Sequence, residues 1–350
     1  MFPYLVAFSL SFINATFRNR ISILFLLFFI IAMSLFRANV GFDWDNYETI
    51  YQGNSDYFFV NEPAFYSLIN ICRAVGFTFP IFVSLCSLIT LFFYYRGIKY
   101  FFPSINEFSL SLSYFVLTYC YFEHFNIIRQ GIAISIFFYA WTFIEKRNFL
   151  LYTGAIFLAV SFHAASIMLF PMYYILRTRV LNKYIYISVI LFLMIVVRFD
   201  INYFIVNLLG HLQGFEFIDR YLSSSTMQSD FITKKSDLGL SKLYPALVFL
   251  FCLSLSTPKI EKLRDVIFFN AGFISLIVLL LSYQVDLFFR FFSFFETSFI
   301  LFFTIIFSGF SFNNRVFLHA FNMLVYSIIT MNMILILELD KYSTYLKYLF

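Results

Sequence analysis

A polar block that directly follows an apolar run contains residue types that can do chemistry. It reads FRANVGFDWDNYETIYQG over residues 36–53 and includes Arg37, Asp43 and Asp45. A carboxylate can act as a general base or bind a divalent metal, and an arginine can bind an anionic group. Charged residues make up only 12% of the chain, so this concentration predicts one wall of a membrane-embedded active site.

A second group of polar side chains opens a predicted helix. In FNIIRQGIAIS, the spacing of Asn126, Arg129 and Gln130 allows all three to lie on one side of the first turn. The positive end of the helix dipole and the N–H groups of that turn bind anions, phosphates in particular. Arg129 therefore indicates either an anion site or a side chain that extends to the membrane surface, and the segment alone favours neither.

Two further residues could join this site. His163 lies in LAVSFHAASIMLFP, the most apolar surroundings of any histidine here. Such a histidine is commonly a core residue, but a position at a predicted bend favours a general base or a phosphate ligand. Arg290 is either half of an intrahelical salt bridge with Asp286 or a third cation facing a cavity. Three arginines at helix ends on one face predict a diphosphate, whose oxygens match guanidinium groups.

Composition places these residues in a membrane protein. The mean hydropathy of the 350 residues is +0.84, and apolar runs of suitable length for a bilayer recur throughout. We predict an all-α, polytopic integral membrane protein with about 11–13 transmembrane helices, some of them half-helices, in a single domain over residues 1–350. The expected spans are 2–16, 21–36, 79–95, 108–122, 130–144, 149–162, 164–176, 184–199, 243–257, 266–283, 288–308 and 316–338.

Lysine and arginine residues concentrate in five short connections, which the positive-inside rule places in the cytoplasm. The other face then carries two larger loops, about 37–61 and 200–242, and a bend near His163. If all five connections lie in the cytoplasm, residues 149–176 must cross the membrane twice. Each arm of this stretch is too short for a full crossing, which predicts a locally thin bilayer or two half-helices. Residues 64–77 have an apolar face and predict a helix lying in the membrane interface.

Other kinds of site lack their residues in this chain. The four cysteines lie singly in apolar surroundings without C-x-x-C spacing, which predicts neither a disulfide nor a zinc site. No P-loop, G-x-G-x-x-G, G-x-S-x-G or H-E-x-x-H motif is present, so nucleotide-driven pumping and metalloprotease chemistry are disfavoured. No basic tract with interleaved aromatic residues occurs, and loop topology explains the net charge of +5. We expect no cofactor, no bound metal and no nucleic-acid partner.

Four blocks, taken in order, resemble a known family. They are VGFDWDNY after Arg37, NEPAFY with Glu62, NIIRQGIA with Arg129 and SFHAAS with His163. Together they resemble the EpsG-like branch of the Wzy polysaccharide polymerases. The resemblance covers about residues 36–176, and FFRFF around the late arginine is similar to the last block of the family only loosely.

The resemblance implies a multi-pass enzyme of the bacterial inner membrane whose active site faces the periplasm. Such an enzyme is a metal-independent glycosyltransferase that polymerises the repeat units of an O-antigen, capsule or exopolysaccharide. It would transfer the growing glycan to an acceptor sugar hydroxyl, with polyprenyl diphosphate as leaving group. Its implied partners are undecaprenyl-diphosphate-linked oligosaccharide, membrane lipid and a chain-length regulator protein.

In this scheme the singled-out residues take three roles. Cations stabilise the charge that develops on the diphosphate, and a base or an orienting group serves the acceptor hydroxyl. The assignment is Arg37, Arg129 and Arg290 to the diphosphate, His163, Asp43 and Glu62 to catalysis, and Asp45, Tyr47, Asn126 and Gln130 to the acceptor sugar.

Three other functions stay open. The acid pair Asp43 and Asp45 favours a glycosyltransferase that uses polyprenyl-phosphate sugars, because that class often uses early acids with a metal. An O-antigen ligase shares donor and leaving group with the polymerase and differs only in the acceptor. The non-enzyme alternative is a lipid-linked oligosaccharide flippase or transporter, which would favour midplane charges and repeated halves. Here the charges concentrate on one face.

Overall fold

The computed structural model describes residues 2–41, 43–53, 62–199, 239–284, 287–336 and 343–344, most of which lie in helices. They form two compact units, one of Met1–Tyr173 with Ala320–Phe350 and one of Tyr174–His319. The single domain expected over residues 1–350 stays a prediction. Most of the expected 200–242 loop lies outside the described residues.

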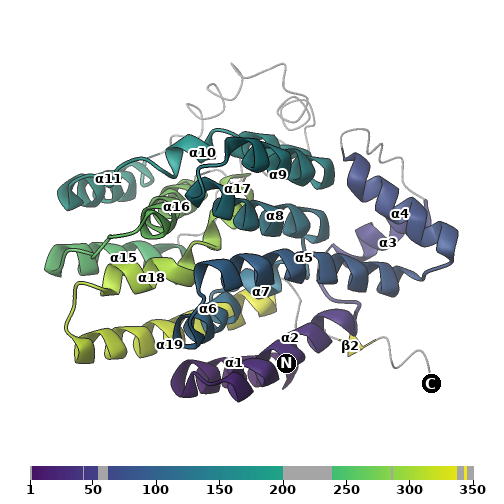
Figure 1. Ribbon diagram of the computed structural model, residues 1–350, viewed down its shortest axis with the longest axis horizontal. Helices are drawn as coiled ribbons and strands as arrows, with labels where there is room; N and C mark the ends of the chain where they lie inside the picture. Colours follow the sequence, from purple (N-terminus) through teal and green to yellow (C-terminus); the bar gives the residue numbers. More distant parts are fainter. Residues whose placement is uncertain are drawn as a thin grey trace. The chain divides into compact units, whose positions relative to one another are not determined.

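The first unit consists mainly of helices from the N-terminal half of the chain (Figure 1). The elements are α1 (Phe2–Phe17), α2 (Arg20–Leu35), β1 (Arg37–Ala38), α3 (Trp44–Gln52), α4 (Pro63–Val75), α5 (Phe79–Phe101), α6 (Ile105–Leu117), α7 (Cys120–Glu123), α8 (Ile128–Glu145), α9 (Phe149–Phe162) and the 3-10 helix η1 (Ala164–Leu169). Those of the second unit are α11 (Lys183–Val196), α15 (Leu240–Leu255), α16 (Leu263–Leu281), α17 (Leu287–Glu296) and α18 (Phe299–Phe307). Two more helices cross the boundary between the units, α10 (Met172–Ile175) and α19 (Phe312–Ile336).

Capping side chains set where several helices begin. Asn19, Ser104, Asn148 and Asn182 each accept a hydrogen bond from a backbone N–H in the first turn of the helix that follows. Such caps satisfy N–H groups that have no partner within the helix, and each contributes roughly 1 kcal/mol. They divide long apolar stretches of sequence into separate helices.

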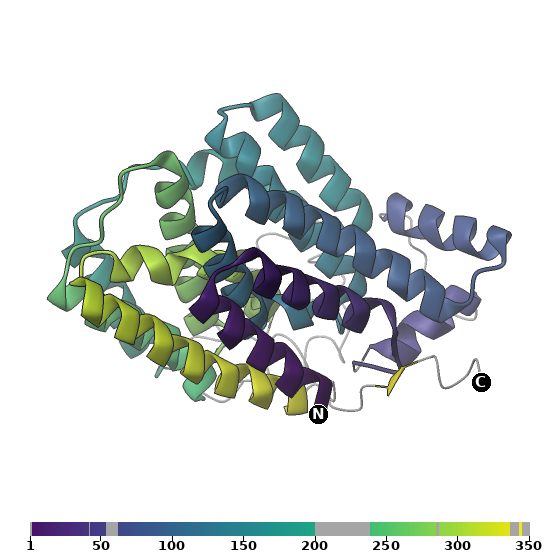
Figure 2. The same cartoon turned by 60° about the horizontal axis from the view of Figure 1, so that its bottom comes forward.

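The expected 37–61 loop contains regular structure. Strand β1 pairs antiparallel with β2 (Ser343–Thr344), Arg37 standing opposite Thr344. Figure 2 shows β2 as a short yellow arrow beside the purple chain. Helix α3 follows and ends at Gly53, whose φ of 81° is left-handed and suits glycine. The block that carries Asp43, Asp45 and Tyr47 is therefore partly helical.

Helix α8 forms the centre of the first unit. It packs against α5 on one side and α9 on another. Most of its residues are buried around its whole circumference, including Trp141 and Phe137, as expected for a helix surrounded by other helices. Gly97 of α5 allows the close approach, because a Cβ there would lie 2.6 Å from the ring of Phe138. The position of α8 is therefore set by the packing of its neighbours.

A buried polar cluster joins α1, α2 and α6. The side-chain amide of Asn14 donates to the backbone oxygen of Ser109 at 2.8 Å and to the hydroxyl of Ser113 at 3.0 Å. Its oxygen accepts from Ser109 at 2.8 Å and from Ser22 at 3.1 Å. Small polar residues of this kind link helices in apolar surroundings, where no water competes for the hydrogen bonds.

In the second unit, α16 packs against α11, α17 and α18. Gly272 lies at the contact with α18, where a Cβ would overlap the ring of Phe302. Asn270 of α16 donates to the backbone oxygens of Leu176 and Thr178, and so holds the chain segment before α11. The segments Phe288–Glu296 and Phe299–Phe307 are bent by 69° at a short break.

By length and composition, three described helices can cross a membrane, namely α5, α16 and α19, and the bent pair α17 and α18 adds a fourth if it forms one span. Six further apolar helices are shorter. The all-α, polytopic membrane architecture is confirmed. The larger number of about 11–13 crossings stays a prediction for the shorter helices. The helix expected at 64–77 is found as α4, and its location in the membrane interface also stays a prediction.

Candidate functional site

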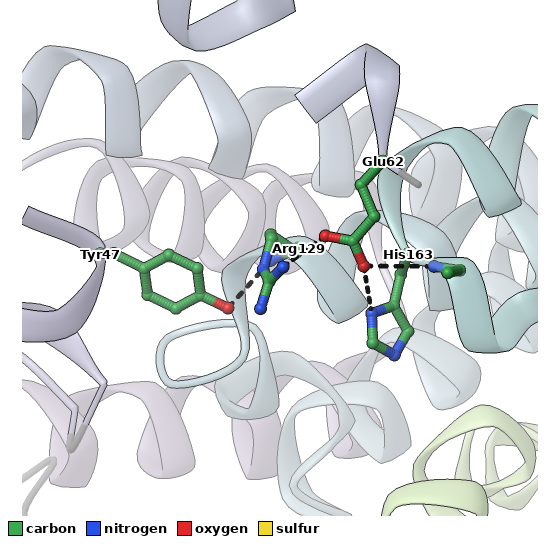
Figure 3. Close-up of polar contacts among 5 residues, drawn as sticks. Tyr47, Glu62, Arg129 and His163 are labelled. Atoms are coloured by element: carbon green, nitrogen blue, oxygen red, sulfur yellow. Dashed lines mark hydrogen bonds and ion pairs between the residues drawn. The ribbon is translucent and has the colours of Figure 1, made fainter. Parts of the chain in front are cut away.

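The carboxylate of Glu62 joins three of the predicted blocks (Figure 3). Its Oε2 forms an ion pair with Nη1 of Arg129. Its Oε1 lies 3.2 Å from Nδ1 of His163 and accepts a hydrogen bond of 3.2 Å from the backbone N–H of Ala164. Residues that are far apart in the sequence thus meet at one carboxyl group, and all of them belong to the first unit.

Local structure explains how each side chain reaches this point. Glu62 is the N-cap residue of α4, and Pro63 begins that helix without an N–H that would need a partner. Arg129 lies in the first turn of α8, as the sequence predicts. His163 caps the C-terminal end of α9 with an extended backbone, φ −152° and ψ 109°, before η1 begins. The predicted bend near His163 is confirmed, and it directs the imidazole toward Glu62 (Figure 3).

Two aromatic rings flank the guanidinium of Arg129. Its Cζ lies 5.7 Å from the ring centre of Tyr47 and 5.9 Å from that of Phe65, within the range of cation–π attraction. The hydroxyl of Tyr47 also accepts a hydrogen bond of 3.5 Å from the backbone N–H of Arg129. Tyr47 is buried, so it supports the arginine, and its contact with an acceptor sugar stays a prediction.

The other predicted residues occupy different places. Asn126 accepts a hydrogen bond of 3.1 Å from the backbone N–H of Asp43, which joins two of the blocks. Asp43 is half-buried, Asp45 is exposed on α3, and Gln130 is buried. Arg290 is exposed on α17 in the second unit, and its part in the site stays a prediction.

Arg37 is completely buried, which the sequence did not indicate. Its side chain has 0% exposed surface, and Nη2 donates to the backbone oxygen of His124 at 3.3 Å. Its Cζ lies 4.4 Å from the ring centre of Phe125. Direct binding of a diphosphate by Arg37 stays a prediction.

The electrostatics of the cluster determine its protonation. Burial alone raises the pKa of the Glu62 carboxyl, but the hydrogen bond with His163 and the charge of Arg129 outweigh burial, so the pKa lies below its ordinary value. Glu62 is therefore ionised at neutral pH and can only accept hydrogen bonds. Nδ1 of His163 must then carry the hydrogen, and in the neutral imidazole Nε2 carries the lone pair. The imidazole is thus arranged to accept a proton at Nε2.

Access to the cluster is partial. The side chains of Arg129 and His163 are each 20% exposed, and that of Glu62 is 10% exposed. Within the described ranges no group of three or more His, Cys, Asp and Glu side chains is arranged to hold a metal ion. The cluster therefore offers one fixed cation and one imidazole to a ligand.

Sequence reasoning missed three contributors to the site. The backbone N–H of Ala164 carries no side-chain signal, and the ring of Phe65 is one of many aromatic residues in the chain. Gly41 has a φ of 95°, and a Cβ there would lie 2.9 Å from the backbone oxygen of Phe125. The only feature of the sequence that could have indicated this close approach was the glycine within VGFDWDNY.

A comparison with known protein families decides where this chain belongs. The sequence pattern described as the EpsG family matches residues 20–350. The chain belongs to the EpsG family. The family is linked to exopolysaccharide biosynthesis, and this EpsG protein is a multi-pass membrane protein. The match extends well beyond the 36–176 region that holds the motif blocks. No match was found among curated proteins or among solved structures.

Proposed function

We propose that this EpsG protein polymerises undecaprenyl-diphosphate-linked repeat units of a bacterial surface polysaccharide at the periplasmic face of the inner membrane. The observation that supports this most strongly is the Glu62 carboxylate, which is bound to Arg129 on one side and to His163 on the other. A glycosyl transfer from a polyprenyl diphosphate needs a cation at the leaving group and a base at the acceptor, and little else. The cluster provides both within reach of one carboxyl group.

Arg129 is the residue that receives the diphosphate. It lies in the first turn of α8, where the helix dipole and the backbone N–H groups already favour an anion. Glu62 forms an ion pair with its guanidinium, and the rings of Tyr47 and Phe65 lie within cation–π distance of it. A pre-positioned cation stabilises the charge that develops on the leaving diphosphate without reorganisation during the reaction.

His163 is the base that activates the acceptor sugar hydroxyl. Glu62 accepts the hydrogen of Nδ1 and so directs Nε2 toward the acceptor, as a carboxylate does in a catalytic triad. Nε2 takes the hydroxyl proton while the hydroxyl oxygen bonds to the anomeric carbon of the growing glycan. The bond from that carbon to the diphosphate oxygen breaks, and its electron pair leaves with undecaprenyl diphosphate near Arg129.

Complementation of a deletion strain tests this function. The surface polysaccharide of a strain that lacks the gene is compared on a gel with that of strains carrying wild type, Arg129→Ala or Arg96→Ala. Arg96 is an exposed arginine of α5 and has no place in the cluster, so Arg96→Ala is the matched control. We expect wild type and Arg96→Ala to restore a ladder, and Arg129→Ala to leave only single repeat units.

Two outcomes would refute the proposal. A full ladder with Arg129→Ala would remove the arginine from the mechanism, because loss of one stabilising donor costs roughly 100-fold or more in rate. Loss of the single-unit band as well as the ladder in the deletion strain would indicate a ligase, a flippase or an enzyme that builds the repeat unit.

A further inference from the structure

The buried position of Arg37 calls for a role other than direct contact with substrate. Its guanidinium donates to the backbone oxygen of His124 and lies over the ring of Phe125, 4.4 Å from its centre. Burial of an arginine costs several kcal/mol unless its charge is well accommodated. A buried arginine is therefore expected where its hydrogen bonds hold a local structure in place. The structure it contacts here is the turn that leads into α8.

Residues 37–41 and 43–47 form a strap along residues 124–129, here called the 124–129 turn, which ends with the first two residues of α8. In its middle, Gly41 adopts a φ of 95° and approaches the turn so closely that a Cβ would meet the backbone of Phe125 and Asn126. Two residues later, the backbone N–H of Asp43 donates to the side chain of Asn126. The strap and the turn are thus joined at their beginning and in their middle.

The far end of the strap reaches the site itself. Tyr47 accepts a hydrogen bond from the backbone N–H of Arg129, and its ring flanks the guanidinium of the same residue. Arg37, Gly41, Asp43 and Tyr47 therefore contact positions in the 124–129 turn in matching order along both segments.

We infer that Arg37 is a positioning residue, which holds the strap on the 124–129 turn and so places Arg129 for the diphosphate. That the anion is a diphosphate rests on the proposed function, whereas the contacts between the strap and the 124–129 turn do not depend on it. A displacement of about 1 Å at a catalytic group can cost on the order of 100-fold in rate, so an arginine that never touches substrate can still be essential. Arg37 acts through Arg129.

Hydrogen exchange of the full-length protein without substrate tests the strap directly. Arg37→Met removes the donor while keeping an unbranched apolar side chain, and Arg96→Met makes the same change at an exposed site. We expect Arg37→Met to speed exchange of the backbone amides of residues 124–131 by about 10-fold, as loss of a hydrogen bond from a charged donor predicts. Exchange in α6 serves as the internal reference, and Arg96→Met leaves both regions unchanged.

Asn126→Ala provides a second variant that keeps Arg37 and removes the middle contact of the strap. It should speed exchange in the same 124–131 region, so the inference stays testable if Arg37→Met does not fold. Unchanged exchange at residues 124–131 in the folded variants would overturn the strap, whatever reaction the protein catalyses.

Binding of inorganic pyrophosphate separates a positioning role from a ligand role. Dissociation constants are measured by calorimetry for wild type, Arg37→Met, Arg129→Lys and the double variant. If part of a variant preparation is unfolded, the fitted stoichiometry falls but the fitted dissociation constant does not change. If Arg37 acts through Arg129, Arg37→Met weakens binding by about 10-fold in wild type and by much less in Arg129→Lys, because the two changes are coupled. Equal weakening in both backgrounds would make Arg37 a ligand and overturn the inference. Absence of pyrophosphate binding to wild type would instead count against the proposed function, and the exchange result would still decide the strap.

Discussion

Replacement of Glu62 by glutamine tests the centre of the site. The amide keeps the shape of the carboxyl but has one acceptor oxygen and one donor NH₂ group. In one orientation the NH₂ group faces Nη1 of Arg129, and in the other it faces Nδ1 of His163 and the N–H of Ala164. Either orientation places two donors against each other, so glutamine cannot reproduce both contacts.

The expected loss follows from the contacts themselves. A hydrogen bond to a charged group contributes roughly 1.5–3 kcal/mol. Glu62 makes such bonds to Arg129 and to His163, and their limited exposure of 20% each leaves little screening by water. Because the amide oxygen of glutamine can still accept from one of the two partners, Glu62→Gln loses one such contact and should lower the free energy of unfolding by about 1.5–3 kcal/mol. Loss of the carboxylate also leaves the imidazole without its orienting partner, which should reduce the polymerisation rate on the order of 100-fold or more.

The assay combines the polysaccharide ladder with thermal unfolding of the purified protein. Glu48→Gln is the matched control, because it makes the same chemical change on α3, where Glu48 interacts with Gln52 of the same helix at 3.5 Å. We expect Glu62→Gln to give single repeat units and a lowered melting temperature, and Glu48→Gln to resemble wild type. A Glu62→Gln protein with a normal ladder and normal stability would refute the reasoning that the carboxylate holds both partners.

The remaining predictions concern pH, packing, a polar cluster and metal removal. The folded-state pKa of Glu62 lies below its ordinary value of 4.5, so its stabilisation is complete above about that pH and is lost as the pH falls through the lower folded-state pKa. The difference in melting temperature between wild type and Glu62→Gln should therefore stay constant from pH 6 to about 4.5 and shrink below that pH, and a difference that stays constant below about pH 4.5 would contradict this. Gly131→Ala should destabilise the protein by about 1–3 kcal/mol, because the new Cβ would lie 2.7 Å from Cβ of His124. Gly154→Ala is its control in denaturant titrations, since a Cβ there meets nothing within 4 Å and should stabilise helix α9 by up to about 1 kcal/mol. Asn14→Ala should cost about 2–3 kcal/mol in the same titration, because Ser109 and its neighbours lose a buried partner; no change would mean that water replaces the amide. Finally, polymerisation by the purified protein should persist in a chelator, and loss of activity there would favour the metal-dependent glycosyltransferase.

Local sequence patterns predicted much of the helical framework. The apolar run that begins after Asn148 predicts a helix over residues 149–162, and α9 occupies those residues. The same holds for the helix that Arg129 opens and for the break at His163. These features depend on neighbouring residues, namely apolar runs, capping side chains and short turns, so one chain segment contains the information that determines them.

The order of the four motif blocks also predicted membership of the EpsG family, which the match over residues 20–350 confirms. The roles of single residues were harder to predict from the sequence. The acceptor-sugar roles of Asp45 and Asn126 stay predictions, and the structure adds that Asp45 is exposed on α3 and that Asn126 accepts a hydrogen bond from the backbone of Asp43. Residue type indicates which contacts a side chain can make and does not indicate which partner the fold supplies.

The sequence by itself determined the membrane class and much of the helical framework, and it indicated which residue types could form the site. Only the tertiary structure decided that Arg129 and His163 both bind the carboxylate of Glu62 and that Arg37 is buried. The physical reason is that these contacts join the ends of α4, α8 and α9, whose mutual positions depend on the packing of helices distant in the sequence. Polar groups meet there because the apolar surfaces of those helices are buried against one another, and that packing energy is a property of the whole unit.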